Sequence, residues 1–137
     1  MHSNTMKIQK PKLLMLGFLL LLLGAANSPA DMSLDTSKLE GQWKMSDKPI
    51  LIEIKFSSDI GQGKIIAHDN DPSAVGKMLL SDIVKDSDHE LWDGFIYVPQ
   101  LSRTHPMKLV LVDDQRINVK VKVGFIRKNV IFLKVDT

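Results

Sequence analysis

Apolar and polar residues alternate with a period of two through most of this chain, and that pattern predicts β-strands. It is clearest in RINVKVKV (residues 116–123), where every second residue is Ile or Val and the residues between are Asn or Lys. Successive side chains of a strand point to opposite faces, so such a segment buries one face. The pattern recurs in ILIEIKF (50–56), MKLVLV (107–112) and VIFLKV (130–135). Shorter candidates are GQWKM (41–45), GKIIAH (63–68), KMLLSDIV (77–84) and WDGFIYV (92–98), which bring the expected strands to about eight.

The connections between these segments are mostly short and rich in Asp, Asn, Gly, Pro and Ser, the residues that form turns. Short connections join antiparallel neighbours, so the strands are expected to follow one another as a meander. Such a small sheet must protect its edges, either by closing into a barrel or by stacking as a sandwich. SLDTSKLEG predicts a helical turn capped by Ser33 or Asp35 and ended by Gly41, with Trp43 just after it. This favours an all-β, eight-stranded antiparallel meander barrel in which the turn and Trp43 close one end.

Residues 1–30 are expected to be a cleaved signal peptide. The segment before Leu13 carries three lysines and no acid, an apolar block follows to Ala26, and small residues end at Ala30. The alternative, a retained membrane anchor, needs roughly 20 apolar residues, more than this block has. Because the chain has no cysteine, it has neither a lipid-modified cysteine nor disulfides. Residues 31–137 are expected to form a single barrel domain, located in the periplasm or secreted, with no stable membrane anchor after cleavage.

Charge in the expected mature chain is nearly balanced. The full sequence has a net charge of +2, but three lysines and no acid lie in the leader. Residues 31–137 keep fifteen Lys and Arg against sixteen Asp and Glu, a net charge of −1. On this count no basic face is expected, and nucleic acid and an anionic membrane surface are not expected partners.

The sequence identifies no catalytic residue and no cofactor, and enzymatic activity ranks third among the functions considered. There is no cysteine and no Gly-x-Ser-x-Gly motif, although a dispersed triad is recognised only by geometry. HDNDP and DSDHE offer imidazole and carboxylate ligands in His68, Asp69, Asp71, Asp86, Asp88, His89 and Glu90. Their spacing matches no established metal loop, so these residues are interpreted as turn formers and no metal site is predicted.

Ligand recognition is assigned to one group of aromatic residues and one connection. Trp92, Phe95 and Tyr97, with Phe56 and Phe125, are expected either to line a cavity or to pack the barrel core. PQLSRTHP is predicted to be a loop at the barrel mouth that carries Arg103 and His105. The candidate ligand-binding residues are Trp92, Phe95, Tyr97, Arg103 and His105.

Motifs across residues 39–135 resemble one known family. LEGQWKM, GQGKIIA, ELWDGFIYVPQ and INVKVKVGFIRKNVIFLKV supply Gly41, Trp43, Gly63, Lys64, Ile65, Trp92, Gly94, Ile96, Tyr97, Pro99 and Gly124. These residues resemble the domain of unknown function (DUF) 2147 family of small exported bacterial proteins. The resemblance implies a lipocalin-like or fatty-acid-binding-like barrel in which Gly41, Trp43 and Gly94 are structural.

The departures from that family indicate a divergent member. Tyr97 is followed by Val98-Pro99 where the family has Asp-Pro, and Lys134 stands where the family has arginine. In lipocalin-like barrels a cation from the last strand often lies across the first tryptophan. The resemblance therefore implies that Lys134 lies over Trp43.

Two functions from different classes are consistent with this sequence. The first is non-catalytic binding of a small apolar or amphipathic ligand inside the barrel. The alternative is a cell-envelope protein–protein interaction module with a filled barrel, contacting its partner through loops or an unpaired strand edge. A cavity lined by the aromatic residues would favour the ligand, and a filled barrel with an exposed apolar patch would favour the protein partner.

Overall fold

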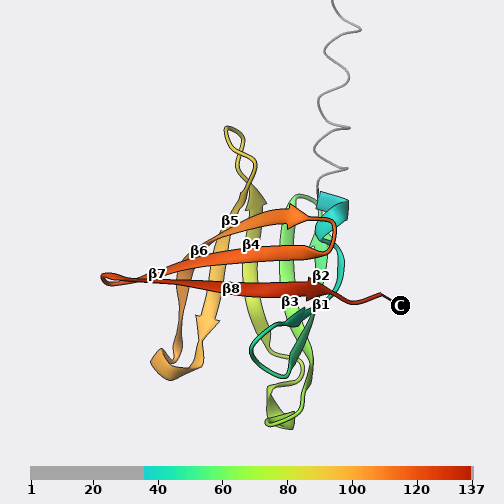
Figure 1. Ribbon diagram of the computed structural model, residues 1–137, viewed down its shortest axis with the longest axis vertical. Coiled ribbons are helices and arrows are strands. Elements are labelled where there is room, and N and C mark those ends of the chain that lie inside the picture. The colour runs from blue at the N-terminus through green and yellow to red at the C-terminus, as the bar shows by residue number, and fades with distance from the viewer. Residues whose placement is uncertain (1–35, 137) are drawn as a thin grey trace, which may run out of the picture. The chain divides into compact units, whose positions relative to one another are not determined.

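The computed structural model describes residues 36–136, which form a closed barrel of eight antiparallel strands in chain order (Figure 1). The strands are β1 (Gly41–Met45), β2 (Ile50–Ser57), β3 (Ile60–His68), β4 (Met78–Lys85), β5 (Trp92–Val98), β6 (Arg103–Asp113), β7 (Arg116–Val123) and β8 (Ile126–Lys134). Two short 3-10 helices, η3 (Pro72–Ala74) and η4 (Pro99–Leu101), follow β3 and β5. The expected all-β meander barrel is confirmed. The expected leader and the caps Ser33 and Asp35 lie outside the described residues.

Within the described part of the chain, helix is limited to a single turn at residues 36–39 and the two 3-10 helices. Within residues 36–136 no helix is long and apolar enough to cross a bilayer. The strands therefore supply nearly all of the regular structure described.

The inner face of the barrel is filled by the apolar side chains that the alternation predicts. In β7, Ile117, Val119 and Val121 are buried, while Lys120 and Lys122 on the opposite face are exposed. The largest fully buried side chains are Trp43, Phe132, Leu39, Ile52, Ile54, Leu80, Ile83, Leu109, Ile117 and Val119. Every member of this core among the described residues lies between Leu39 and Phe132, so the barrel has its own hydrophobic core.

Trp43 closes one end of the barrel together with the helical turn before it. Its side chain is fully buried, and its Nε1 donates a hydrogen bond of 2.8 Å to the carbonyl of Leu39. Lys134 lies directly opposite on β8, with its Nζ 4.7 Å from the centre of the indole ring and 2.7 Å from the carbonyl oxygen of Glu40. Gly41 is required here because its φ of +127° is a backbone conformation that residues with a Cβ rarely adopt. The expected positions of Gly41, Trp43 and Lys134 are confirmed.

Lys134→Met is expected to lower the free energy of unfolding by about 0.5–1 kcal/mol, the usual contribution of an exposed cation–π contact. Methionine keeps the aliphatic stem over the indole and removes the ammonium together with its hydrogen bond to Glu40. Urea unfolding checks this. Lys134→Arg, which restores a cation, should recover most of the loss, and equal stability of the Met variant and the wild type would contradict the prediction.

A β-bulge in β4 shapes the wall of the barrel next to Gly94. Ser81 pairs with Phe95 and Val84 pairs with Asp93, so Asp82 and Ile83 both oppose Gly94. Asp82 has a φ of +51°, which marks the bulge as a sharp local bend. The carbonyl oxygen of Ser81 would lie 2.9 Å from a Cβ on Gly94, so only glycine leaves room for this backbone.

The β7–β8 hairpin projects beyond the body of the barrel (Figure 1). The ladder between β6 and β7 ends at Met107 and Val121, and β1 pairs with β8 only from Phe132 to Lys134. Residues 122–127 are therefore paired only with each other. Residues 124–129 are all exposed, and the alternation of buried and exposed side chains is lost there because neither face of the hairpin is covered.

Candidate functional site

Trp92, Phe95 and Tyr97 do not line one common cavity, because their side chains lie on opposite faces of β5. Trp92 is buried in the core and points inward from β5, with the Nζ of Lys85 4.6 Å from its ring centre. Phe95 and Tyr97, an odd number of residues away, point outward and are 40% and 37% exposed. The expectation of one cavity lined by all three is corrected by the alternation of side chains along β5. The expectation that Phe125 lines a cavity or packs the core is also wrong, since its side chain is fully exposed.

Arg103 and His105 lie within β6 and not on a loop as expected. The connection is limited to η4 and Ser102, because Val98 already pairs with Arg103. Arg103 is exposed, whereas His105 is buried on the inner face, opposite Ile96. The Nε2 of His105 has no hydrogen-bond partner among the described residues. The two residues therefore do not form a common mouth site.

The turn after β3 satisfies its own polar groups. The Nδ1 of His68 accepts hydrogen bonds from the backbone N–H groups of Asn70 (3.3 Å) and Asp71 (3.1 Å). The carboxylate of Asp71 accepts a hydrogen bond from the Ser73 hydroxyl, which lowers the pKa of Asp71 below its ordinary value. These contacts are those of a turn that stabilises its own backbone.

The turn after β4 lies at the opposite end of the barrel from the turn after β3, because β4 runs from one end of the barrel to the other. Asp86 accepts the backbone N–H of Asp88 at 2.8 Å, which lowers the pKa of Asp86, and the Nδ1 of His89 lies 3.4 Å from the Asp86 carboxylate. The two His/Asp segments therefore do not converge. In the part of the chain that the structure describes, no three His, Asp or Glu residues are grouped closely enough to hold a metal ion.

A groove of about 910 Å³ lies on the outside of the barrel, where β4, β5 and β6 meet the projecting part of β7–β8. It is outside the lumen because most of its lining side chains alternate with core residues and point away from them. Its apolar lining includes Val84, Phe95 and Pro106, and its acids are Asp82 and Asp93. Its cations are Lys108, Lys120, Lys122, Arg127 and Lys128. This outer groove is the candidate site.

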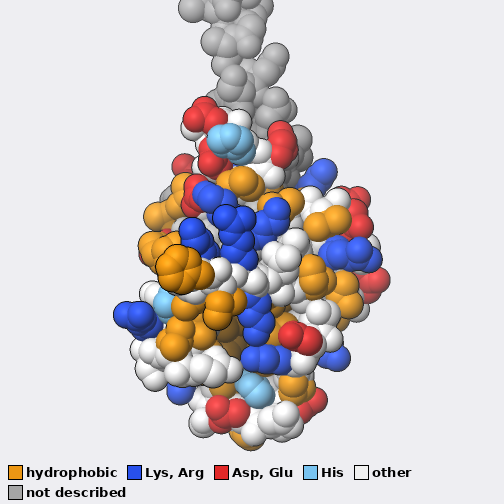
Figure 2. All heavy atoms as spheres, turned by 60° about the vertical axis from the view of Figure 1, so that its left-hand side comes forward, with side chains coloured by type: hydrophobic (Ala, Val, Ile, Leu, Met, Phe, Trp, Pro, Cys, Tyr) orange, Lys and Arg blue, Asp and Glu red, His pale blue; other side chains and the backbone are white. Residues whose placement is uncertain are grey.

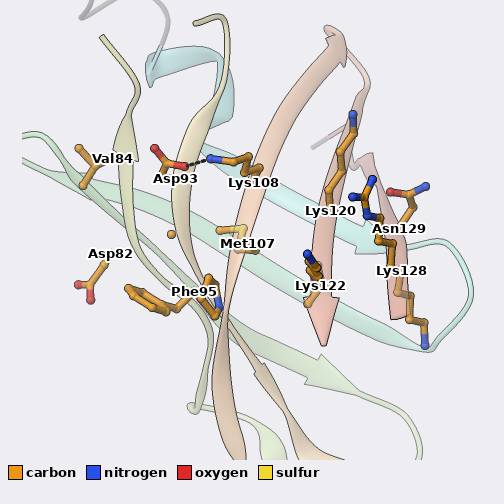
Figure 3. Close-up of a pocket in the computed structure, with 14 residues that line it drawn as sticks. Asp82, Val84, Asp93, Phe95, Met107, Lys108, Lys120, Lys122, Lys128 and Asn129 are labelled. Carbon is orange, nitrogen blue, oxygen red and sulfur yellow. Dashed lines mark hydrogen bonds and ion pairs between the residues drawn. The ribbon is translucent and has the colours of Figure 1, made fainter. Parts of the chain in front are cut away.

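Figure 3 shows the arrangement of the outer groove in close-up. Asp93 and Lys108 point toward each other, with their oxygen and nitrogen 2.7 Å apart. This hydrogen bond to Asp93 raises the pKa of Lys108 above its ordinary value. Phe95 lies farther along β5 than Asp93, and Lys120 and Lys122 come from β7.

Three neighbouring strands bring the cations of the outer groove together. Lys108 lies opposite Lys120, and Lys122 lies opposite Arg127. Among the described residues, Lys120, Lys122, Arg127 and Lys128 make no ion pair. Like charges directly across a sheet repel each other, so an anion bound among them would be stabilised. Figure 2 shows Lys and Arg side chains gathered beside hydrophobic ones on this side of the molecule.

The expectation that the protein has no basic face is therefore wrong. Net charge is a sum that says nothing about how charges are distributed, and the groove holds five cations against two acids, Asp82 and Asp93. Sequence reasoning missed Lys108, Lys120 and Lys122 as site residues. The available signal was the alternation of residues 116–123, which places Arg116, Lys120 and Lys122 on one face of one strand.

Comparisons with protein-family models, with curated proteins and with solved structures found no match for this chain. The resemblance to the DUF2147 family therefore rests on the motif residues in the sequence. The class of protein that the structure defines is a small closed eight-stranded barrel with a filled interior and a basic outer groove.

Proposed function

We propose that this chain is an exported, non-catalytic binding protein that holds a small amphipathic anion in its outer groove. Export is proposed from the signal-peptide pattern of residues 1–30, and a divergent place in the DUF2147 family is proposed from the motif residues. The observation that carries the binding proposal is an apolar, cation-lined groove on the outside of a barrel whose inner face is packed.

The position of the ligand differs from the interior site expected from the sequence. Trp92, the largest of the candidate aromatic residues, is part of the packed core, so it supports the barrel instead of a ligand. Phe95 is the candidate that lines the groove. A volume of about 910 Å³ is suited to a ligand the size of a fatty acid or a lipid fragment.

The chemistry of the lining defines the ligand class. Phe95, Val84 and Pro106 offer apolar surface to a hydrocarbon chain. Lys120 and Lys122 offer charged N–H donors, which form stronger hydrogen bonds with a carboxylate or phosphate than with neutral groups. An anionic head group with an apolar tail satisfies both halves of the groove.

Phe95→Ala is expected to weaken binding of dodecanoate about tenfold, or about 1.4 kcal/mol, because the ring supplies much of the apolar wall. Isothermal titration calorimetry of residues 31–137 with sodium dodecanoate below its micelle concentration measures this. Tyr97→Ala is the matched control, since Tyr97 points outward from the same strand but does not line the groove.

Two further probes define the charge requirement. Dodecyltrimethylammonium has the same tail and the opposite charge, and it should bind far more weakly than dodecanoate. Lys120→Gln should weaken dodecanoate binding, whereas Lys44→Gln, on the outer side of β1, should not. No binding by the wild type, or equal losses in the Phe95 and Tyr97 variants, would overturn the proposal.

A protein-interaction module is the second candidate function, and the packed interior together with one open edge favours it. Residues 126–130 of β8 pair with β7 on one side and with no described strand on the other. An unpaired edge can accept a strand from another chain, and the charges of Arg127 and Lys128 on this edge would restrict that strand to one with acidic side chains. Native mass spectrometry of the exported protein separates the candidates, because a bound small anion and a bound polypeptide differ greatly in mass.

A further inference from the structure

The tip of the β7–β8 hairpin exposes two large apolar side chains that touch little of the barrel. Phe125 is 103% exposed and Ile126 is 71% exposed, the two highest values among the exposed large hydrophobic residues. Both follow Gly124, whose φ of +61° allows the tight turn. An apolar pair held away from the core adds nothing to the packing of the barrel. It is therefore free to contact a membrane or another molecule.

Basic residues surround this tip, and no acid is near it in sequence. Residues 115–135 contain six Lys and Arg and no Asp or Glu. The rest of residues 31–137 then has nine cations and sixteen acids, a net charge of −7. Lys122 and Arg127 lie opposite each other just behind the tip, and Lys128 follows. Arg116 and Lys134 lie at the other end of the hairpin, within the barrel, so the projection itself carries three cations, Lys122, Arg127 and Lys128, and no acid.

We infer that the β7–β8 hairpin docks the protein on the surface of an anionic phospholipid bilayer, with Phe125 and Ile126 inserted among the lipids. An aromatic and an aliphatic side chain at the tip suit the interface between head groups and acyl chains. The cations behind them suit the negative surface, each strengthening adsorption by about fivefold. This docking goes beyond the proposed ligand binding and does not depend on it.

The shape and charge of the hairpin favour a bilayer over a protein partner. The tip is convex and isolated, so it offers no pocket or flat area of the size a stable protein interface needs. Arg127 and Lys128 lie on the open edge of β8, where charged side chains hinder the addition of another strand. A lipid surface requires only what the hairpin has, apolar side chains at the end and positive charge around them.

Co-sedimentation with vesicles tests the inference on residues 31–137, the part of the chain with the complete core. Vesicles of equal parts phosphatidylcholine and phosphatidylglycerol are expected to bind the protein, and pure phosphatidylcholine vesicles are expected to bind it at least tenfold more weakly. The double variant Phe125→Ser, Ile126→Ser should lose at least tenfold in binding. Ile60→Ser, Val112→Ser removes two other exposed apolar side chains, at the start of β3 and near the end of β6, and should bind like the wild type.

A tryptophan at the tip reports insertion directly. Trp43 and Trp92 are both buried, so in Phe125→Trp only the new side chain can change its surroundings. Its fluorescence emission should shift to shorter wavelength with the anionic vesicles and not with the neutral ones.

The charges behind the tip are tested separately. The double variant Lys122→Gln, Arg127→Gln should weaken binding several-fold, and added salt should do the same, because exposed charges are screened within about 10 Å at 0.1 M ionic strength.

Four results would overturn the inference. They are absence of binding to the anionic vesicles, equal binding by the tip variant and the wild type, binding without a shift in emission, and self-association without lipid that the tip variant abolishes. Melting curves of each variant confirm folding. Dodecanoate titration of the tip variant distinguishes this inference from the proposed function, because neither Phe125 nor Ile126 lines the groove and ligand binding should be unchanged.

Discussion

Trp43→Ala will lower the free energy of unfolding by about 3–5 kcal/mol, the usual loss when a large buried aromatic side chain is removed. The indole is fully buried at the closed end of the barrel, and its Nε1 donates to the Leu39 carbonyl. Alanine would leave a cavity beside Phe132 and Leu39, other fully buried members of the same core, and an unpaired carbonyl. It would also remove the surface on which the Lys134 ammonium lies.

Urea unfolding of residues 31–137, followed by far-ultraviolet circular dichroism, measures this change without relying on the fluorescence that the substitution removes. Each kcal/mol corresponds to about 4–8 °C in melting temperature for a domain of this size. Lys44→Ala, at the next position but on the outer face, should leave stability within about 0.5 kcal/mol. Trp43→Phe should fall between, since it keeps a ring but not the donor to Leu39. Unchanged unfolding of Trp43→Ala would refute the assignment of Trp43 to the barrel end.

Gly94→Ala will lower the free energy of unfolding by about 1–3 kcal/mol, the usual effect of adding a methyl group where the interior is already packed. The new Cβ would lie 2.8 Å from the terminal methyl of Met107 and 2.9 Å from the carbonyl oxygen of Ser81. Met107 ends in a flexible thioether and can move. The Ser81 carbonyl belongs to the bulged backbone of β4, so relieving that contact shifts the strand.

The same unfolding assay tests this prediction, with Phe95→Ala as its control. Phe95 is the next residue on β5 and points outward, so its loss should change stability by about 0.5 kcal/mol or less. The Gly94→Ala variant is also expected to alter the outer groove, because Asp82 of the bulge and Gly94 itself both line it. If Gly94→Ala were as stable as the wild type, the bulge would not require glycine.

Much of the fold was predictable from residue order because a strand repeats every two residues. The strand boundaries of residues 41–45 and 116–123 match the expected ones, and β3 and β6 begin only a few residues earlier than expected. Alternation also identifies which side of a strand is buried, so the inward position of Trp92 and the outward positions of Phe95 and Tyr97 followed from their spacing. Grouping these three as one ligand site neglected that spacing.

The candidate site was much less predictable. Lys108, Lys120 and Arg127 come from three segments whose relative positions depend on the register of two ladders. A shift of one residue in either ladder would turn alternate side chains to the other face and disperse the charges. The balanced total charge concealed the cluster, because charge clustering depends on position in space.

The sequence alone determined the all-β class, the strands and the inward-facing residues, since these depend on local periodicity and on burying apolar surface. The tertiary structure decided where the functional surface lies. Closure leaves β8 paired with β1 over only its last three residues, so the start of β8 and the end of β7 extend beyond the barrel. The basic groove and the projecting tip of Phe125 and Ile126 both arise from that register, which depends on contacts between residues far apart in the chain.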